Sequence, residues 1–267
     1  MQPTTKKHAF ITGGGKGIGY AIAQTLLTGD YRVTIAGRNE EVLRMAAGQL
    51  SAMVPVTDEA AASMVAYVIM DVANAASVRD AIAVATARFG SVNILVNNAG
   101  QASSAPFLKT DPQQWQDMLN VNLMGTVHCT REVLPSMLVN GWGRIINVAS
   151  TAGRVGYPYV SAYCAAKHAV VGLTRSLALE VANKGVTVNA VCPGYTETDI
   201  VKDAVTNIMD KTGRSEEQAR SALAAGNPMQ RLVQPDEVAN TVAWLCQMQA
   251  SAMTGQAIAV AGGEVMQ

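Results

Sequence analysis

Short segments, most of them continuously apolar, alternate with longer alanine-rich segments along almost the whole chain. The apolar segments cover residues 8–12, 32–36, 66–70, 94–97, 144–149, 187–192 and 257–260. Continuous apolar runs are typical of strands that are buried on both faces. Their alternation with helical segments is typical of a parallel sheet covered by helices on both sides. The sequence therefore predicts an α/β fold, a doubly wound Rossmann-type domain with a seven-stranded, mostly parallel sheet.

No linker or repeat divides the chain, so we expect a single domain over residues 1–267. Its longest predicted helix runs from Asp111 to Val139, with Asp111 as N-cap, and Pro135 should kink or interrupt it. The stretch 193–228 is irregular and exceeds the roughly 15 residues of ordinary connections. We expect it to carry one or two short helices and to act as a substrate lid.

The charge balance and the apolar pattern exclude several kinds of partner. The 20 basic and 20 acidic residues give no basic footprint for nucleic acid. No apolar run approaches the roughly 20 residues of a membrane span, and residues 1–8 lack the features of an export signal. The four cysteines are scattered singly, which indicates neither a disulfide framework nor a metal site. We expect a cytoplasmic protein without a membrane or nucleic-acid partner.

A glycine-rich turn, TGGGKGIG at residues 12–19, follows the first apolar segment and precedes a predicted helix. Exposed N–H groups and the helix dipole at such a place favour a pyrophosphate. Ile18 stands where the third glycine of the usual Rossmann pattern would fall, and Gly17 stands where a Walker A loop needs Ser or Thr. The spacing from Thr12 through Gly13 and Gly17 to Gly19 fits a dinucleotide cradle, with a purely structural turn as the alternative.

The end of the second apolar segment indicates which dinucleotide this cradle binds. NAD enzymes typically place a carboxylate there to bind the ribose 2'-hydroxyl. This chain has Gly37 and then Arg38, and Lys16 projects from the glycine turn. Both cations can bind a 2'-phosphate, although they can also be ordinary solvated side chains. Asp71, after the third segment, suits the adenine amino group or a helix N-cap.

Tyr163 and Lys167 are four residues apart in a predicted helix and should share one face. A free tyrosine has a pKa near 10, and an adjacent ammonium favours the phenolate, so we expect Lys167 to lower the pKa of Tyr163. Ser150 closes the fifth apolar segment, at the edge where doubly wound folds place their ligands. Its hydroxyl can hold a substrate oxygen opposite the tyrosine.

These features together resemble the short-chain dehydrogenase/reductase family, in its compact single-domain branch. The match spans almost the whole chain and comprises TGGGKGIG at 12–19, Asp71, NNAG at 97–100, Asn122, Ser150, Tyr163, Lys167 and Pro193-Gly194.

The resemblance implies a role for each matched residue. Tyr163 would exchange a proton with the substrate oxygen, and Ser150 would orient that oxygen. Lys167 would bind the nicotinamide ribose as well as act on Tyr163. Asn122 would anchor a water of a proton relay, or distort its helix, or do both. The residues implied to contact NADP(H) are Gly13, Lys16, Gly17, Ile18, Gly19, Arg38, Asn39, Asp71, Val72, Asn98, Ala99, Gly100, Tyr163, Lys167, Pro193, Gly194 and Thr198.

The implied function is hydride transfer between NADP(H) and a carbonyl or secondary alcohol. Residues 188–195 and 231–238 look most like reductases of 3-oxoacyl thioesters and polyketide ketones, whose substrates can be linked to CoA or a carrier protein. An aliphatic or aryl secondary-alcohol dehydrogenase is the alternative within the family. A nucleotide-sugar epimerase would be longer, and a cofactor-sensing regulator need not keep all four catalytic residues.

The resemblance also implies a homo-oligomer, and we expect a homotetramer. Two long alanine-rich helices, predicted over residues 111–139 and 158–182, carry small side chains that allow subunits to pair closely.

Overall fold

The computed structural model describes residues 6–54 and 64–266, which form one parallel sheet with helices on both faces. The strands are β1 (His8–Thr12), β2 (Arg32–Gly37), β3 (Val65–Ile69), β4 (Val92–Asn97), β5 (Gly143–Val148), β6 (Val186–Pro193) and β7 (Ala257–Val260). All seven predicted strands are therefore confirmed, and every pairing between them is parallel. The single domain over 1–267 remains a prediction, because residues 1–5, 55–63 and 267 lie outside the described part.

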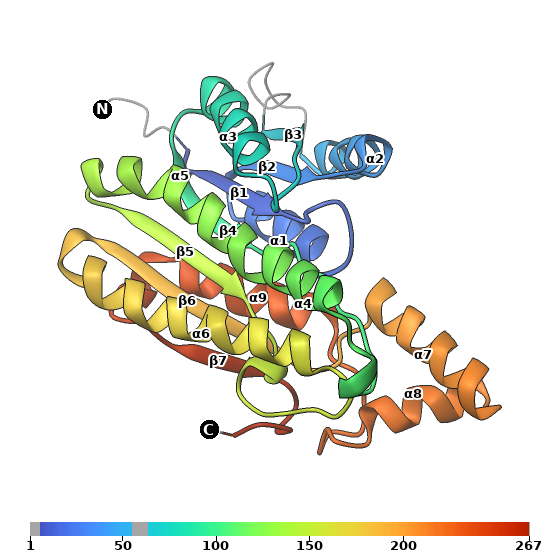
Figure 1. Ribbon diagram of the computed structural model, residues 1–267. Helices are drawn as coiled ribbons and strands as arrows, with labels where there is room; N and C mark the ends of the chain where they lie inside the picture. The colour runs from blue at the N-terminus through green and yellow to red at the C-terminus, as the bar shows by residue number, and fades with distance from the viewer. Residues whose placement is uncertain (1–5, 55–63, 267) are drawn as a thin grey trace.

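The helices cover the sheet in two layers (Figure 1). They are α1 (Gly17–Thr28), α2 (Glu40–Ala52), α3 (Ala75–Phe89), α4 (Pro112–Leu119), α5 (Gly125–Val139), α6 (Ser161–Val181), α7 (Asp199–Thr212), α8 (Glu216–Ala224) and α9 (Pro235–Cys246). Helices α1, α2 and α9 pack on one face, and α3, α5 and α6 pack on the other. Each layer buries its own apolar cluster against the strands, and this burial is the main force that holds the fold together.

The strand order places the candidate residues at one edge of the sheet. The order is β3-β2-β1-β4-β5-β6-β7. Successive strands are added on one side of β1 as far as β3 and then on its other side from β4 onwards, so the strand order reverses between β1 and β4. Ligands of doubly wound folds bind at the carboxyl ends of the strands beside this reversal. Gly13 follows β1, Asn98 follows β4, Ser150 comes shortly after β5, and Gly194 follows β6.

The predicted helix from Asp111 to Val139 is irregular, but not at the predicted place. Asp111 caps α4 as expected, with a capping box. The interruption is a π-helical turn, Asn120–Met124, between α4 and α5, while α5 continues through Pro135. The prediction that Pro135 interrupts the helix is thus wrong, and a kink there stays a prediction. The Asn122 side chain donates to the Met118 carbonyl, and such a competing bond accompanies the widened turn.

The stretch 193–228 contains two helices, α7 and α8, as expected. They extend away from the sheet edge (Figure 1) and pack on each other through a small apolar cluster that includes Val201, Val205 and Ala219. This separate packing is consistent with a segment that moves as a unit, and its role as a lid remains a prediction.

Two further expectations concern what the chain lacks. None of the helices in the described part is both long enough and apolar enough to cross a membrane. The four cysteines are free thiols, and the described residues hold no cluster of three potential metal ligands.

Candidate active site

The glycine turn after β1 forms a cradle that side chains would fill. Gly13 and Gly17 have left-handed φ angles of 65° and 55°, which residues with a Cβ rarely adopt. A Cβ on Gly19 would lie 2.2 Å from the Gly13 carbonyl oxygen. Lys16, the N-cap of α1, makes no side-chain bond to the first helical turn. The N–H groups of that turn are therefore available to an anion, as a pyrophosphate requires.

Asn98 and Thr12 hold this turn in place. The Asn98 side-chain amide donates to the Thr12 and Gly13 carbonyls at 3.0 and 3.2 Å. The Thr12 hydroxyl accepts from the backbone N–H groups of Asn98 and Ala99. These bonds connect the ends of β1 and β4, so NNAG at 97–100 has a structural role beside its predicted contact with the cofactor.

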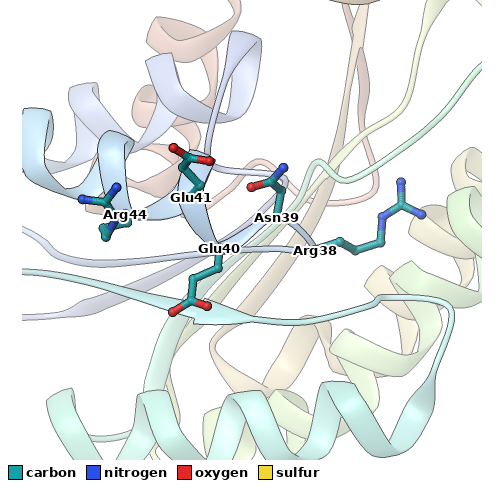
Figure 2. A pocket seen from close by; sticks show the side chains of 5 residues that line it. All are labelled: Arg38, Asn39, Glu40, Glu41 and Arg44. Atoms are coloured by element: carbon teal, nitrogen blue, oxygen red, sulfur yellow. The ribbon is translucent and has the colours of Figure 1, made fainter.

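Arg38 lies where the sequence placed the 2'-phosphate, at the end of β2. It lines an open hollow of about 640 Å³ with Asn39, Glu40, Glu41 and Arg44. Figure 2 shows its guanidinium extended away from Arg44 and Glu41. The Asn39 side-chain oxygen, Oδ1, caps α2 by accepting from the Val42 N–H. Arg44 adds a second cation that the sequence analysis missed, although its position one helical turn after Glu40 was visible there.

Lys16 contacts the start of α7 in the structure. Its ammonium forms an ion pair with Asp199 at 2.7 Å, across to the first residue of α7. Thr198 lies beside the same turn, because a Cβ on Gly17 would come within 3.2 Å of the Thr198 methyl carbon. The turn and the start of α7 are therefore adjacent, and the predicted Lys16 contact with the adenosine end requires Lys16 to leave Asp199.

Three other predicted cofactor residues have local partners. Asp71 accepts from the Ala73 N–H, and the N-cap of α3 is Asn74, so the N-cap alternative for Asp71 is wrong. Val72 is buried against α5, where a Cβ on Gly125 would touch it. Ile18 packs partly buried against the core beneath the sheet.

Ser150, Tyr163 and Lys167 meet beyond the carboxyl end of β5. The Ser150 hydroxyl lies beside the Tyr163 phenol and accepts from the Ala152 N–H. The Lys167 ammonium is buried, donates to the Val148 carbonyl at 2.9 Å and lies 5.7 Å from the centre of the Tyr163 ring. Helix α6 presents Tyr163 and Lys167 on one face, as their spacing predicted.

The electrostatics of this group differ from the expectation. Burial raises the pKa of Tyr163 to about 12, although the nearby Ser150 hydroxyl opposes the rise. Burial also lowers the pKa of Lys167 to about 8. The predicted lowering of the Tyr163 pKa is thus wrong for the protein alone, because desolvation of the phenolate is the largest influence on it. Tyr163 is therefore protonated at neutral pH, the form that can donate a proton.

Asn122 lies against the same group. Its amide donates to the Gln101 and Met118 carbonyls, and its oxygen accepts from the Gln101 N–H. A Cβ on Gly100 would lie 2.8 Å from that oxygen and 3.6 Å from the Lys167 nitrogen. Asn122 is therefore confirmed as a residue of the distorted helix, and the absence of a side chain at Gly100 keeps it close to Lys167.

Pro193 ends β6, and the Gly194 N–H donates to the Val260 carbonyl. Beside Gly194 lies Glu264, which the sequence analysis missed. Tyr157 was missed as well, and it hydrogen-bonds both Glu264 and Thr151. The sequence held no signal for Glu264, because only the tertiary structure brings the C-terminal segment to the end of β5.

Comparison with known proteins agrees with this geometry. The model of the family described as short chain dehydrogenase matches residues 7–208. A putative ketoacyl reductase of Streptomyces coelicolor is 38% identical, over 96% of this chain and 95% of its own length. A D-beta-hydroxybutyrate dehydrogenase of Rhizobium meliloti is 36% identical, over 96% and 98%.

The fold also matches a solved ketoreductase. A single-substitution variant of the actinorhodin polyketide ketoreductase, solved with NADPH, superposes with a TM-score of 0.91 at 37% identity and covers 99% of both chains. Three observations indicate the same family: the sequence match, the sheet order and the group formed by Ser150, Tyr163 and Lys167. The chain belongs to the short chain dehydrogenase family of oxidoreductases.

Proposed function

We propose that the protein reduces a ketone with NADPH, and that a 3-oxoacyl thioester or a similar ketone is its substrate. The observation that carries the proposal is the meeting of Ser150, Tyr163 and Lys167 at the sheet edge that also holds the glycine cradle. The relatives named as ketoacyl reductases and the ketoreductase solved with NADPH support it.

Each of these residues has a defined task in the proposed reaction. NADPH, when bound, supplies the hydride. Ser150 donates a hydrogen bond to the carbonyl oxygen, and the protonated Tyr163 gives that oxygen its proton. The buried Lys167 charge favours the phenolate that remains. Asn122, in contact with Gln101, would hold the water through which Tyr163 regains a proton from solvent.

The described residues fit NADP(H). The cradle accommodates a pyrophosphate, and Arg38 offers a cation where the 2'-phosphate would lie. The proposed contacts with the cofactor are completed by Asn39, Asp71, Val72, Asn98 to Gly100, Pro193, Gly194 and Thr198.

Substitution of Gly19 tests the cradle. We expect Gly19→Ala to weaken NADPH binding and to destabilise the fold by about 1–3 kcal/mol, because the new methyl group overlaps the Gly13 carbonyl. Gly48→Ala is the matched control: Gly48 lies in α2 with nothing within 4 Å of a Cβ, so alanine should stabilise the fold by about 0.5–1 kcal/mol. Urea unfolding and NADPH titration measure both effects. Normal NADPH affinity in Gly19→Ala would contradict the cradle.

Activity measurements test the whole proposal. We expect NADPH consumption with acetoacetyl thioesters to exceed that with cyclic and aryl ketones. A reverse preference, with faster alcohol oxidation, would favour the secondary-alcohol dehydrogenase, which the hydroxybutyrate dehydrogenases among the relatives support as a second candidate. Cofactor binding without turnover of any substrate would favour a regulator.

We further propose a homotetramer that pairs through α5 and α6. Val139 and Leu179 are 86% and 82% exposed on these helices, and such exposed apolar side chains are typical of contact surfaces. Light scattering at micromolar concentration should give four times the chain mass, and Leu179→Glu should reduce it. A monomeric wild-type protein would refute the proposal. Location in the cytoplasm remains a prediction from the sequence.

A further inference from the structure

We infer that Glu264 and Tyr157 form a recognition element for the substrate beside the catalytic residues, one that favours a ketone with a hydrogen-bond donor and disfavours a ketone with a free carboxylate. The inference rests on the proposed function and narrows its substrate class.

Tyr157 connects Glu264 to the residue that follows Ser150. Its hydroxyl lies 2.5 Å from Glu264 Oε1 and 2.9 Å from the Thr151 hydroxyl. A phenol has one hydrogen to donate, and a carboxylate only accepts, so Tyr157 donates to Glu264 while Thr151 donates to Tyr157. Thr151 follows Ser150 directly, so this chain of bonds begins beside the hydroxyl that orients the substrate oxygen.

The other oxygen of the Glu264 carboxylate, Oε2, faces the turn after β6, where a Cβ on Gly194 would lie 2.8 Å away. Gly194 belongs to the proposed contact set of the cofactor. The carboxylate therefore lies between two segments of the site, Thr151 after β5 and Gly194 after β6. It is held there by the turn that follows β7.

The Glu264 carboxylate has no cation close to it in the described part of the chain. Among the described residues, no Lys, Arg or His nitrogen comes within 4.0 Å of Glu264. Burial and the bond to Glu264 raise the pKa of Tyr157, so its phenol stays protonated and adds no charge. The negative charge of Glu264 thus lies beside Gly194 without a neighbouring cation to neutralise it. It repels a substrate carboxylate and accepts hydrogen bonds from a substrate donor.

An aromatic surface lies beside this carboxylate. The rings of Tyr157 and Tyr195 meet edge to face, with centres 6.4 Å apart, and Tyr195 is 40% exposed. Aromatic faces next to a carboxylate suit a hydroxyl or a protonated amine on an otherwise apolar substrate. A hydroxyl and a protonated amine both supply a hydrogen-bond donor, and a comparison of a hydroxy ketone with an amino ketone distinguishes them.

Two matched substrate pairs test the inference in the wild-type enzyme. We expect kcat/KM for methyl acetoacetate to exceed that for acetoacetate by at least about tenfold, because only the second carries a free carboxylate. We expect 4-hydroxybutan-2-one to exceed pentan-2-one, in which a methyl group replaces the hydroxyl. A larger gain for 4-(dimethylamino)butan-2-one than for the hydroxy ketone would identify an ammonium as the donor. Equal values within both pairs would overturn the inference.

Variants assign the effect to Glu264. Glu264→Gln should reduce the ester-to-acid ratio at least about fivefold, since it removes the charge and keeps the shape. Glu264→Asp, which keeps the charge, should retain a preference for the ester. Asp80→Asn removes a carboxylate from an exposed position in α3 and should leave the ratio unchanged. An unchanged ratio in Glu264→Gln would overturn the inference alone, whereas a wild-type enzyme that reduces no ketone would overturn the proposed function.

Discussion

Tyr163→Phe should reduce ketone turnover by about 10²- to 10⁴-fold, the effect typical of losing a general acid. The change removes the proton donor and keeps the ring that α6 presents to the site. Unfolding free energy and NADPH affinity should therefore stay near the wild-type values, within a few fold for affinity. Steady-state kinetics, urea unfolding and NADPH titration provide the three measurements.

Lys167→Ala is the comparison that separates the two roles. Lys167 is buried and close to both Tyr163 and Gly100, so its loss should weaken NADPH binding as well as turnover. A Tyr163→Phe protein with nearly normal kcat would end the assignment. One that unfolds would show instead that the phenol supports the core.

The raised pKa of Tyr163 predicts how the rate of ketone reduction depends on pH. A group with a pKa of about 12 stays protonated throughout the neutral range, so the supply of the acid form does not change there. Reduction by wild-type enzyme should accordingly keep a constant kcat/KM between about pH 6 and pH 7.5. A steady fall in reduction over that interval would show that Lys167 lowers the tyrosine pKa as the sequence had predicted.

Arg38→Ala should remove most of the preference for NADPH over NADH. In the wild type we expect at least about a tenfold preference, because a charge-assisted contact with the 2'-phosphate contributes about 1.5–3 kcal/mol before screening. Arg38 is exposed at the end of β2 and its guanidinium points away from Glu41 and Arg44 (Figure 2), so its loss should leave stability unchanged. The ratio of kcat/KM for the two cofactors measures the effect.

Lys16 provides the matched comparison for Arg38. It pairs with Asp199 in the structure, so Lys16→Ala should reduce the preference less than Arg38→Ala does. Equal use of NADPH and NADH by the wild type would contradict the account of Arg38, as would an Arg38→Ala variant that keeps its preference.

The elements of the sheet were predictable because their signals are local. Seven buried strands appear as seven apolar runs, and Asp111 with Pro112 gives the start of α4 directly. The π-turn at Asn120–Met124 was not predictable from propensity, and its Asn122 side chain bonds both Met118 within the helix and the separate segment at Gln101. Local sequence indicated Pro135 instead, whose missing N–H the helix tolerates.

In the candidate site, too, local sequence patterns predicted some features and could not predict others. The spacing of Tyr163 and Lys167 on one helix predicted their meeting, because four residues return to the same helical face. The direction of Lys16 depends on Asp199, 183 residues later in the chain, and no local pattern indicates that pair. The pKa of Tyr163 was also beyond reach, because it depends on how deeply the finished fold buries the phenol.

Transfer of deuterium from labelled NADPH to the alcohol product tests hydride transfer by this enzyme. The enzyme is mixed with NADPH deuterated at the transferable position and with an acetoacetyl thioester, and the product is analysed by mass spectrometry. The account predicts a secondary alcohol that carries one deuterium per NADPH consumed, with formation slowed at least about 10²-fold in Tyr163→Phe. NADPH that binds without yielding deuterated alcohol from this or any other ketone would contradict it.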